Sequence, residues 1–253
     1  MSAQPEILCC PTAAIDDALL SEYRMLLSAD ELQRLNGYRS AHAAKEFVIG
    51  RALLRTALAQ RLQVDSNTLV FARDEDGKPQ LAYPSNQLWH FNLSHERSWV
   101  VLMLSTLGPV GVDVEGHARR NNLAGIAQRF FSPEENAALT QCNEPDWRDY
   151  FFAIWTLKEA HAKALGCGLA KILSCSSITL DWTDARIDFA LHDIARSAMP
   201  LSGWLYHLEN NVSLAAIANA THEIAEPTLA RVVPLRSTEI LPISILARGS
   251  WLP

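Results

Sequence analysis

The segment GVDVE (111–115) carries two carboxylates at a spacing that metal chemistry uses. Alternate residues of a strand share a face, so Asp113 and Glu115 point the same way while Val112 and Val114 point into the core. Neighbouring carboxylates repel each other, and a hard divalent cation such as Mg²⁺ relieves that repulsion. Taken alone, the pair is more typical of a solvated strand face, and a metal site is the alternative.

A second pattern is WTLKEAHAKALGCGL (155–169). On a helix, Trp155, Glu159 and Lys163 follow each other at four-residue spacing and share one face. Glu159 can supply a third oxygen ligand to the same cation, and Lys163 can reach a phosphate oxygen or serve as an acid–base group. The simpler alternative is a surface Glu–Lys pair, which contributes only about 0.3–0.5 kcal/mol.

Two upstream segments contain side chains that could bind an anion. The tripeptide GKP places Lys78 on an exposed turn, and HFNLSH (90–95) alternates apolar residues with Asn92 and Ser94 before His95. Neutral donors followed by an imidazole at a strand end suit a phosphate ester. A half-buried strand with a hydrogen-bonded histidine is the simpler alternative.

The elements that must position these groups follow from periodicity and capping signals. Ser28 is expected to cap one helix, and in FSPEE (131–135) Ser132 and Glu135 are expected to form a capping box. We expect helices over residues 16–36, 39–62, 123–130, 131 onward and 147–165. We expect strands over residues 5–15, 68–73, 80–83, 88–94, 98–105, 111–115, 176–181, 186–191, 202–208 and 212–218.

The order of helices followed by strands occurs twice along the chain. This order predicts an α+β fold with two halves of similar element order, at 1–107 and 108–220. Residues 221–253 are rich in proline, and we expect them to form an irregular C-terminal extension that packs on the body.

Composition excludes several classes. The 253 residues are 49% hydrophobic, which can offset chain entropy, so disorder is not expected. A net charge of −6 offers no overall attraction for nucleic acid or anionic membranes, and no run of 18 apolar residues is present. Zinc-site, P-loop, GxGxxG and GxSxG patterns are absent. We expect a cytoplasmic protein with reduced thiols at Cys9, Cys10, Cys142, Cys167 and Cys175.

Each pattern is weak alone, but together GKP, FNLSH, GVDVE, FSPEE and WTLKEAHAKALGCGL resemble the 4′-phosphopantetheinyl transferases of the Sfp type, over about residues 30–180. The resemblance implies a pseudo-two-fold α+β fold with the active site between the halves. It also implies coenzyme A as the donor, Mg²⁺ as the cofactor, and a serine hydroxyl of an acyl or peptidyl carrier protein as the acceptor. Adenosine 3′,5′-bisphosphate would be the second product.

The same resemblance implies roles for individual residues. The metal ligands would be Asp113, Glu115 and Glu159, and Lys163 would lie near the pyrophosphate. The nucleotide contacts would be Lys78, Asn92, Ser94 and His95, with looser matches at Arg34 and Arg73. The register before residue 45 leaves Arg39 and Lys45 as alternatives to Arg34.

Glu135 matches the glutamate of the FSxxE segment and would help to position or deprotonate the acceptor serine. Lys163 and a metal-bound water are the alternative bases. A purely structural role for Glu135 in the capping box is a third possibility. Glu159, Lys163 and Glu135 are therefore the predicted catalytic residues.

Two other functions use the same groups. A Mg²⁺-dependent phosphohydrolase would consume coenzyme A without a carrier, and a non-catalytic module would bind coenzyme A or a carrier protein. The module would be expected to lack the metal ligands, whereas Asp113, Glu115 and Glu159 all match, and we favour the transferase over both alternatives. We expect a monomer because one chain holds both halves, with no nucleic-acid or membrane partner, and carriers of several pathways are compatible with the sequence.

Overall fold

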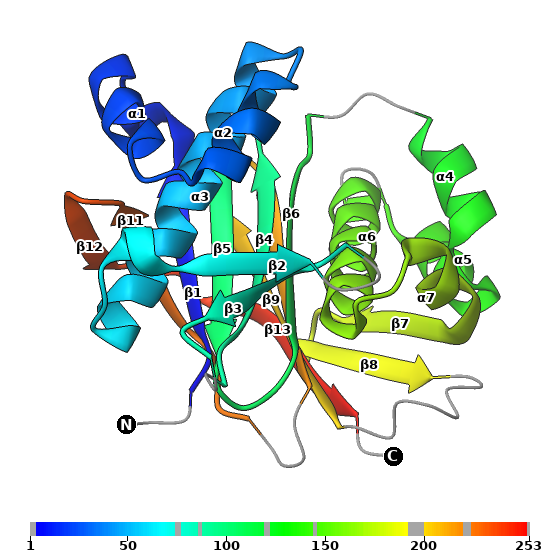
Figure 1. Cartoon of the computed structure of the whole chain (residues 1–253). Coiled ribbons are helices and arrows are strands. Elements are labelled where there is room, and N and C mark those ends of the chain that lie inside the picture. Colours follow the sequence, from blue (N-terminus) through cyan, green and yellow to red (C-terminus); the bar gives the residue numbers. More distant parts are fainter. Residues whose placement is uncertain are drawn as a thin grey trace.

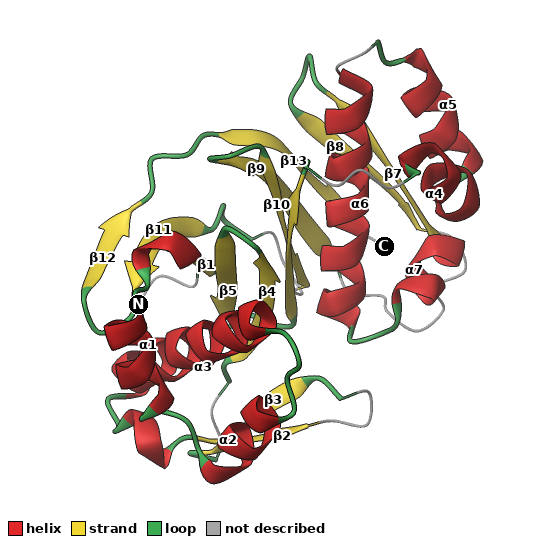
Figure 2. Cartoon of the chain, turned by 90° about the horizontal axis from the view of Figure 1, so that it is seen from above, coloured by secondary structure: helices red, strands yellow, loops and turns green. Residues whose placement is uncertain are grey.

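The computed structural model of this chain describes residues 4–73, 77–85, 88–118, 122–143, 146–191, 200–219 and 224–251. Two β-sheets form its centre, and each is covered by one long helix, as Figures 1 and 2 show. No helix among the described residues is long and apolar enough to cross a bilayer. The helices are α1 (Asp17–Arg24), α2 (Ala29–Asn36), α3 (Ala41–Leu62), α4 (Leu123–Phe130), α5 (Pro133–Gln141), α6 (Asp146–Leu165) and α7 (Leu169–Cys175).

The first sheet has the strand order β12-β11-β1-β5-β4. Its strands are β1 (Glu6–Pro11), β4 (His90–Glu96), β5 (Trp99–Ser105), β11 (Thr228–Val233) and β12 (Ser237–Ile240). A separate hairpin consists of β2 (Val70–Arg73) and β3 (Pro79–Tyr83). All pairs of the first sheet are antiparallel except β1 with β11.

The second sheet has the order β6-β10-β9-β13-β8-β7. Its strands are β6 (Val110–Gly116), β7 (Ser176–Asp181), β8 (Arg186–Leu191), β9 (Leu201–Leu208), β10 (Val212–Asn219) and β13 (Ile245–Trp251). Helix α6 packs on β6 and β10, as α3 packs on β5 and β4.

The same order of elements occurs twice. Strand β1, helices α1 to α3 and strands β2 to β5 are followed by strand β6, helices α4 to α7 and strands β7 to β10. In each half the first strand pairs with the last, because β1 pairs with β5 and β6 pairs with β10. The predicted α+β fold with two similar subdomains is confirmed.

Alternation along β1 separates two apolar cores. Leu8 and Cys10 face α3, whereas Ile7 and Cys9 face a core shared with β6, β9 and β10. The two sheets therefore pack face to face between their long helices. Burial raises the pKa of the Cys9 and Cys10 thiols to about 12, so both behave as small core hydrophobes, as the sequence predicted.

The C-terminal segment corrects one expectation. We predicted that residues 221–253 are an irregular extension, but β11, β12 and β13 belong to it and join both sheets. Its described prolines, Pro227, Pro234 and Pro242, stand between strands, and β11 pairs with β1, more than 200 residues earlier in the chain. The local sequence pattern cannot indicate a strand partner so far away in the chain.

The short helix α7 was also not predicted. The proposed domain boundaries at 107 and 220 stay predictions.

Gly111 lets a strand and a helix touch through their backbones. A Cβ atom at this position would lie 2.0 Å from the carbonyl oxygen of Ala160 and 2.4 Å from the amide nitrogen of Ala164. Atoms do not approach so closely, so only glycine allows β6 to lie this near α6. The functional groups of both elements depend on this contact.

We expect Gly111→Ala to lower the free energy of unfolding by about 3 kcal/mol or more, because neither clashing atom is on a flexible side chain. Gly50→Ala, inside α3, is the matched control, because the nearest atom to its added Cβ is a Val100 methyl at 3.6 Å. The control should be neutral or stabilising by up to about 1 kcal/mol. Urea unfolding measures both, and equal stabilities for the two variants would contradict the close-contact explanation.

Candidate active site

Strands β4 and β6 lie side by side where the two halves meet, next to α6 (Figure 1). Asn92 Oδ1 on β4 accepts a hydrogen bond from the Val112 amide on β6 at 3.0 Å. One step along the same face of β4, Ser94 Oγ donates to Asp113 Oδ1 at 2.9 Å. The polar residues of FNLSH therefore join the two halves, and the expected alternation along GVDVE is observed.

Lys163 of α6 completes this group. Its Nζ donates to Asp113 Oδ1 at 2.6 Å and to Ser94 Oγ at 2.9 Å. Asp113 is 5% exposed, while the Lys163 side chain keeps 28% of its surface open. We call Ser94, Asp113 and Lys163 the seam cluster. It pairs a partly exposed lysine side chain with a buried carboxylate, and its residues come from three segments of the sequence.

Lys78 connects the hairpin to the seam cluster. Its Nζ donates to the Lys163 carbonyl oxygen at 2.6 Å. Lys78 also lines a cavity of about 400 Å³ with His90 and the end of α6 at Gly166. Burial and the Lys78 ammonium both lower the pKa of His90, so this cavity favours a neutral imidazole beside a cation. The GKP lysine and the helix of the WTLKEAHAKALGCGL segment are thus brought together.

The three predicted metal ligands lie on the facing elements β6 and α6. Glu115 follows Asp113 on the same face of β6, Glu159 precedes Lys163 by one turn of α6, and both glutamates are half-buried. Among the described residues, no group of three or more His, Cys, Asp or Glu side chains converges into a ready metal site. The ligand set is therefore not assembled in this conformation and stays a prediction.

Asp113 nevertheless fits a cation. Its Oδ2 is buried and, among the described residues, has no hydrogen-bond partner. A buried carboxylate oxygen without a partner is costly unless something positive meets it. Carboxylate oxygens on facing elements are also the donors that Mg²⁺ prefers. The chemistry of these residues therefore suits the implied metal ion.

The end of β6 is anchored by His117. Its Nδ1 lies 2.9 Å from Asp149 Oδ1 on α6, and its Nε2 lies 2.8 Å from Ser213 Oγ on β10. Burial lowers the pKa of His117, so the imidazole is neutral. The three groups have the order of a hydrolase triad, but Ser213 is part of β10, where it pairs with Glu115 of β6 and His207 of β9. These contacts therefore hold the end of β6, next to Glu115, against α6 and β10.

Arg34 and Arg73 lie apart from the seam cluster, in a second pocket of about 510 Å³. Arg51 and Arg55 of α3 line it too, with the rings of Phe47 and Phe71. Pro79 borders this pocket and also the cavity at Lys78. Arg51 and Arg55 were not among the predicted nucleotide contacts, although their spacing of one helical turn places both on one face of α3. Of the alternatives to Arg34, Lys45 is engaged elsewhere, since its Nζ donates to the Ile15 carbonyl at 2.7 Å.

His95 is exposed and faces α3 instead of β6. Its Nδ1 lies 3.3 Å from Glu46 Oε2. Asn92 and Ser94 point to the seam cluster, so the FNLSH segment serves two sides of β4. The structure thus separates His95 from the other predicted nucleotide contacts on the same strand.

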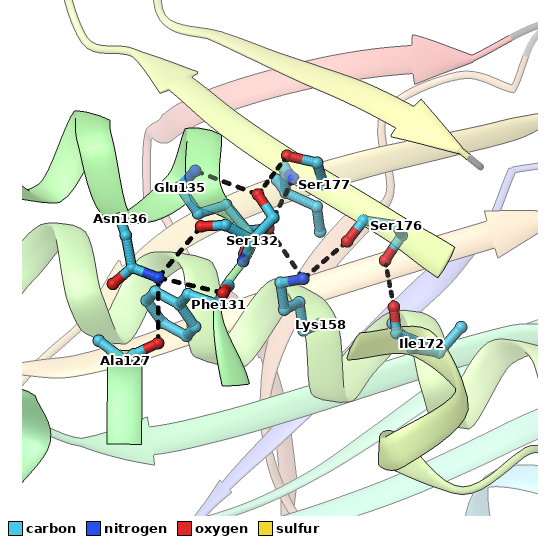
Figure 3. A network of polar contacts seen from close by, with 10 residues as sticks. Ala127, Phe131, Ser132, Glu135, Asn136, Lys158, Ile172, Ser176 and Ser177 are labelled. Carbon is cyan, nitrogen blue, oxygen red and sulfur yellow. Dashed lines mark hydrogen bonds and ion pairs between the residues drawn. The ribbon is translucent and has the colours of Figure 1, made fainter. Parts of the chain in front are cut away.

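Glu135 is fully buried in a structural network, shown in Figure 3. Its Oε2 accepts the Ser132 amide at 2.7 Å in the predicted capping box. Its Oε1 lies 2.9 Å from Lys158 Nζ and accepts the Ile178 amide at 2.7 Å. Burial raises the pKa of Glu135, while Lys158 opposes that shift. These contacts favour a structural role, and deprotonation of an acceptor by Glu135 stays a prediction.

Comparison with known proteins identifies the family of this chain. A family model for the 4′-phosphopantetheinyl transferase superfamily matches residues 109–216, and one for the N-terminal part of a 4′-phosphopantetheinyl transferase matches residues 16–106. A 4′-phosphopantetheinyl transferase of Bacillus subtilis is 34% identical over 175 residues, covering 68% of this chain and 75% of the relative. The transferase Sfp of Bacillus subtilis strain 168 is 28% identical, covering 68% and 74%.

A solved structure is also similar in part. It is a holo-(acyl-carrier-protein) synthase from Bacillus anthracis in complex with CoA (3′,5′-ADP), with 20% identity, a TM-score of 0.35, and coverage of 40% of this chain and 93% of that chain. So low a score does not place any residue of this chain. The family assignment rests on the sequence matches. The chain belongs to the 4′-phosphopantetheinyl transferase superfamily. The predicted family and enzyme class are confirmed.

The Glu135–Lys158 pair predicts a large stability effect. Lys158→Met leaves a fully buried carboxylate without its cation, which should cost about 3–5 kcal/mol. Arg186→Met is the control, because it breaks an exposed pair with Asp188 and should change stability little. Denaturant unfolding measures both variants.

Substitution of Glu135 distinguishes its structural role from the predicted acid–base role. For Glu135→Gln we expect lower stability with activity per folded molecule largely retained, since the amide keeps part of the capping box. A loss of kcat in well-folded Glu135→Gln would instead support the acid–base role.

The buried imidazole of His161 predicts that the folded protein loses stability as the pH falls. Burial and the Lys158 ammonium lower its pKa to about 4, below the ordinary value of 6.5. As pH falls from 6.5 towards 4, the unfolded chain takes up a proton that the folded chain refuses, so stability falls, by about 3 kcal/mol at most. Thermal unfolding of His161→Leu should show a smaller loss between pH 7 and pH 5 than the parent chain. Parallel pH profiles would contradict this assignment.

Proposed function

We propose that this enzyme transfers the 4′-phosphopantetheine group of coenzyme A to a serine hydroxyl of an acyl or peptidyl carrier protein. The reaction would depend on Mg²⁺ and release adenosine 3′,5′-bisphosphate. The observation that supports this most is the seam cluster, in which Lys163 lies 2.6 Å from a buried Asp113 whose second oxygen has no hydrogen-bond partner among the described residues. An ammonium beside a carboxylate that has one oxygen without a partner among the described residues suits a metal–pyrophosphate complex.

Asp113, Glu115 and Glu159 would hold the metal ion. A bound Mg²⁺ supplies charge neutralisation for the pyrophosphate of the donor. Binding of a cation at Asp113 would compete with Lys163 for the carboxylate and so leave its ammonium available to a phosphate oxygen. Because Lys163 is partly exposed, it can turn to the leaving phosphate and stabilise charge there.

The nucleotide end would meet the cationic groups of the N-terminal half. Lys78 and the pocket of Arg34 and Arg73 provide positive charge beside apolar and aromatic surface. His95 would contact the phosphorylated ribose. Positioning of donor and acceptor, more than covalent help, is what phosphoryl transfer asks of the protein. We also propose a monomeric cytoplasmic enzyme, since one chain supplies both halves of the site.

The test is incubation with coenzyme A, Mg²⁺ and apo carriers from fatty-acid, polyketide, nonribosomal-peptide and lysine biosynthesis, followed by intact mass measurement. We expect one carrier class to gain one phosphopantetheine group. Lys163→Ala and Glu159→Ala should each lower the rate about 100-fold or more, because both act on transition-state charge. Glu209→Ala, at an exposed glutamate paired with Arg231, is the control and should keep the parent rate.

Other results of this experiment would favour one of the alternative functions or contradict the proposed metal site. Cleavage of coenzyme A without a carrier would favour the phosphohydrolase. Binding of coenzyme A with every carrier left apo would favour the binding module. Full activity after chelation of metal, or in Glu159→Ala, would contradict the proposed metal site.

A further inference from the structure

A pocket of about 510 Å³ lies where α2, α3 and the β2–β3 hairpin meet, and its wall is rich in positive charge. Six ionisable side chains line it, namely Arg34, Arg51, Arg55, Arg73, Asp30 and Glu31. Four positive and two negative charges give these side chains a net charge of +2, although the whole chain carries −6. A concave site with an excess of positive charge favours an anionic ligand.

Arg55 of α3 is engaged with the protein through every nitrogen of its guanidinium. Its Nε and Nη2 lie 2.9 Å and 2.8 Å from Glu31 Oε2. Its Nη1 donates to the carbonyl oxygens of Ser66 at 2.9 Å and Leu69 at 3.0 Å. The side chain is only 2% exposed. These contacts give Arg55 a structural role, in which it ties α3 to α2 and to the start of the hairpin.

Arg51, one helical turn earlier on α3, is held in a different way. Its guanidinium makes no hydrogen bond among the described residues, and Glu31 Oε1 lies 3.6 Å from its Nη1, beyond hydrogen-bond distance. The ring centroids of Phe47 and Phe71 lie 5.6 Å and 5.9 Å from its Cζ. Contacts with aromatic faces position a guanidinium without using its N–H donors. The donors of Arg51 are therefore in place in the pocket but lack an acceptor.

The electrostatics around Arg51 also favour an added anion. Burial lowers the pKa of Arg51 and Glu31 opposes that shift, while the nearby guanidinium groups of Arg34 and Arg55 lower it further. The Glu31 carboxylate is shared, because its Oε2 already accepts from Arg55 and from the Ser28 amide. A phosphate in the pocket would supply acceptor oxygens and offset the repulsion between the guanidinium groups.

We propose that Arg51 is a specificity-determining residue that recognises the 3′-phosphate of coenzyme A and so distinguishes the donor from 3′-dephospho-coenzyme A. The inference rests on the proposed function, in which this pocket receives the nucleotide end of the donor. A guanidinium binds a phosphate through two parallel N–H donors, which is the arrangement that a planar, pre-positioned arginine offers. Of the two arginines one turn apart on α3, Arg55 supports the pocket and Arg51 reads the ligand.

Calorimetric titration with coenzyme A and with 3′-dephospho-coenzyme A, both with Mg²⁺, tests this as a ratio of two Kd values. Arg51→Met should raise the Kd for coenzyme A about 10- to 100-fold and the Kd for the dephospho form about twofold or less, because a hydrogen bond to a charged group contributes on that scale. Arg51→Lys should recover only part of the ratio, since an ammonium cannot form the bidentate pair.

Two further variants serve as comparisons. Arg61→Met is the matched control, because Arg61 is a largely buried arginine of the same helix that pairs with Glu6 and borders a different pocket. It should keep the parent ratio of Kd values. Arg55→Met should lower the Tm of the ligand-free protein by about 6 °C or more, whereas Arg51→Met should shift it by about 3 °C or less.

The outcomes separate this inference from the proposed function. An unchanged ratio of Kd values in Arg51→Met overturns the inference, and so does an equal rise in Kd for both donors, even if carriers are modified. If Arg51→Met is unfolded by circular dichroism, Arg51→Lys decides, with an expected fall in the ratio of about threefold or more. The expected ratios without modification of any carrier would contradict the transferase and leave this inference standing. Failure to bind coenzyme A overturns both.

Discussion

The site depends on the backbone contact between β6 and α6. Without a side chain at Gly111, the strand lies close enough to the helix for Lys163 to reach Asp113 at 2.6 Å. Residues 111 and 113 share a face of the strand, and residues 159, 160, 163 and 164 share a side of the helix. One contact therefore sets the distance between the carboxylates of β6 and the functional groups of α6.

Two neighbouring residues of α6, Lys158 and Glu159, lie in different environments. Lys158 is fully buried against Glu135 and Ser176, and it ties the helix to α5 and β7. Glu159, the next residue, is half-buried and lies one turn from Lys163. In the WTLKEAHAKALGCGL segment, a lysine of a structural ion pair is thus followed directly by the glutamate that we propose as a metal ligand. His117 supports β6 in a similar way, because it holds the strand end near Glu115 to both α6 and β10.

Cationic side chains gather at the junction of the halves and in the second pocket, although the chain as a whole is acidic. Lys163 and Lys78 lie at the junction of the halves, and the arginines of the second pocket lie beyond Pro79. Arg51 and Arg55 are paired with Glu31, and Lys163 is paired with Asp113. Such pairing keeps the ammonium and guanidinium groups in place before a ligand binds.

Local sequence determined much of this protein. Periodicity and capping residues predicted nearly all helices and strands up to residue 219, because those signals act within a few residues. The alternation in GVDVE predicted the shared face of Asp113 and Glu115, and the motifs predicted the family. Tertiary structure alone decided that His95 turns to Glu46, that Glu135 is enclosed by Lys158, and that residues 228–251 form strands. Those features arise between segments far apart in the chain, where local pattern holds no information about the partner.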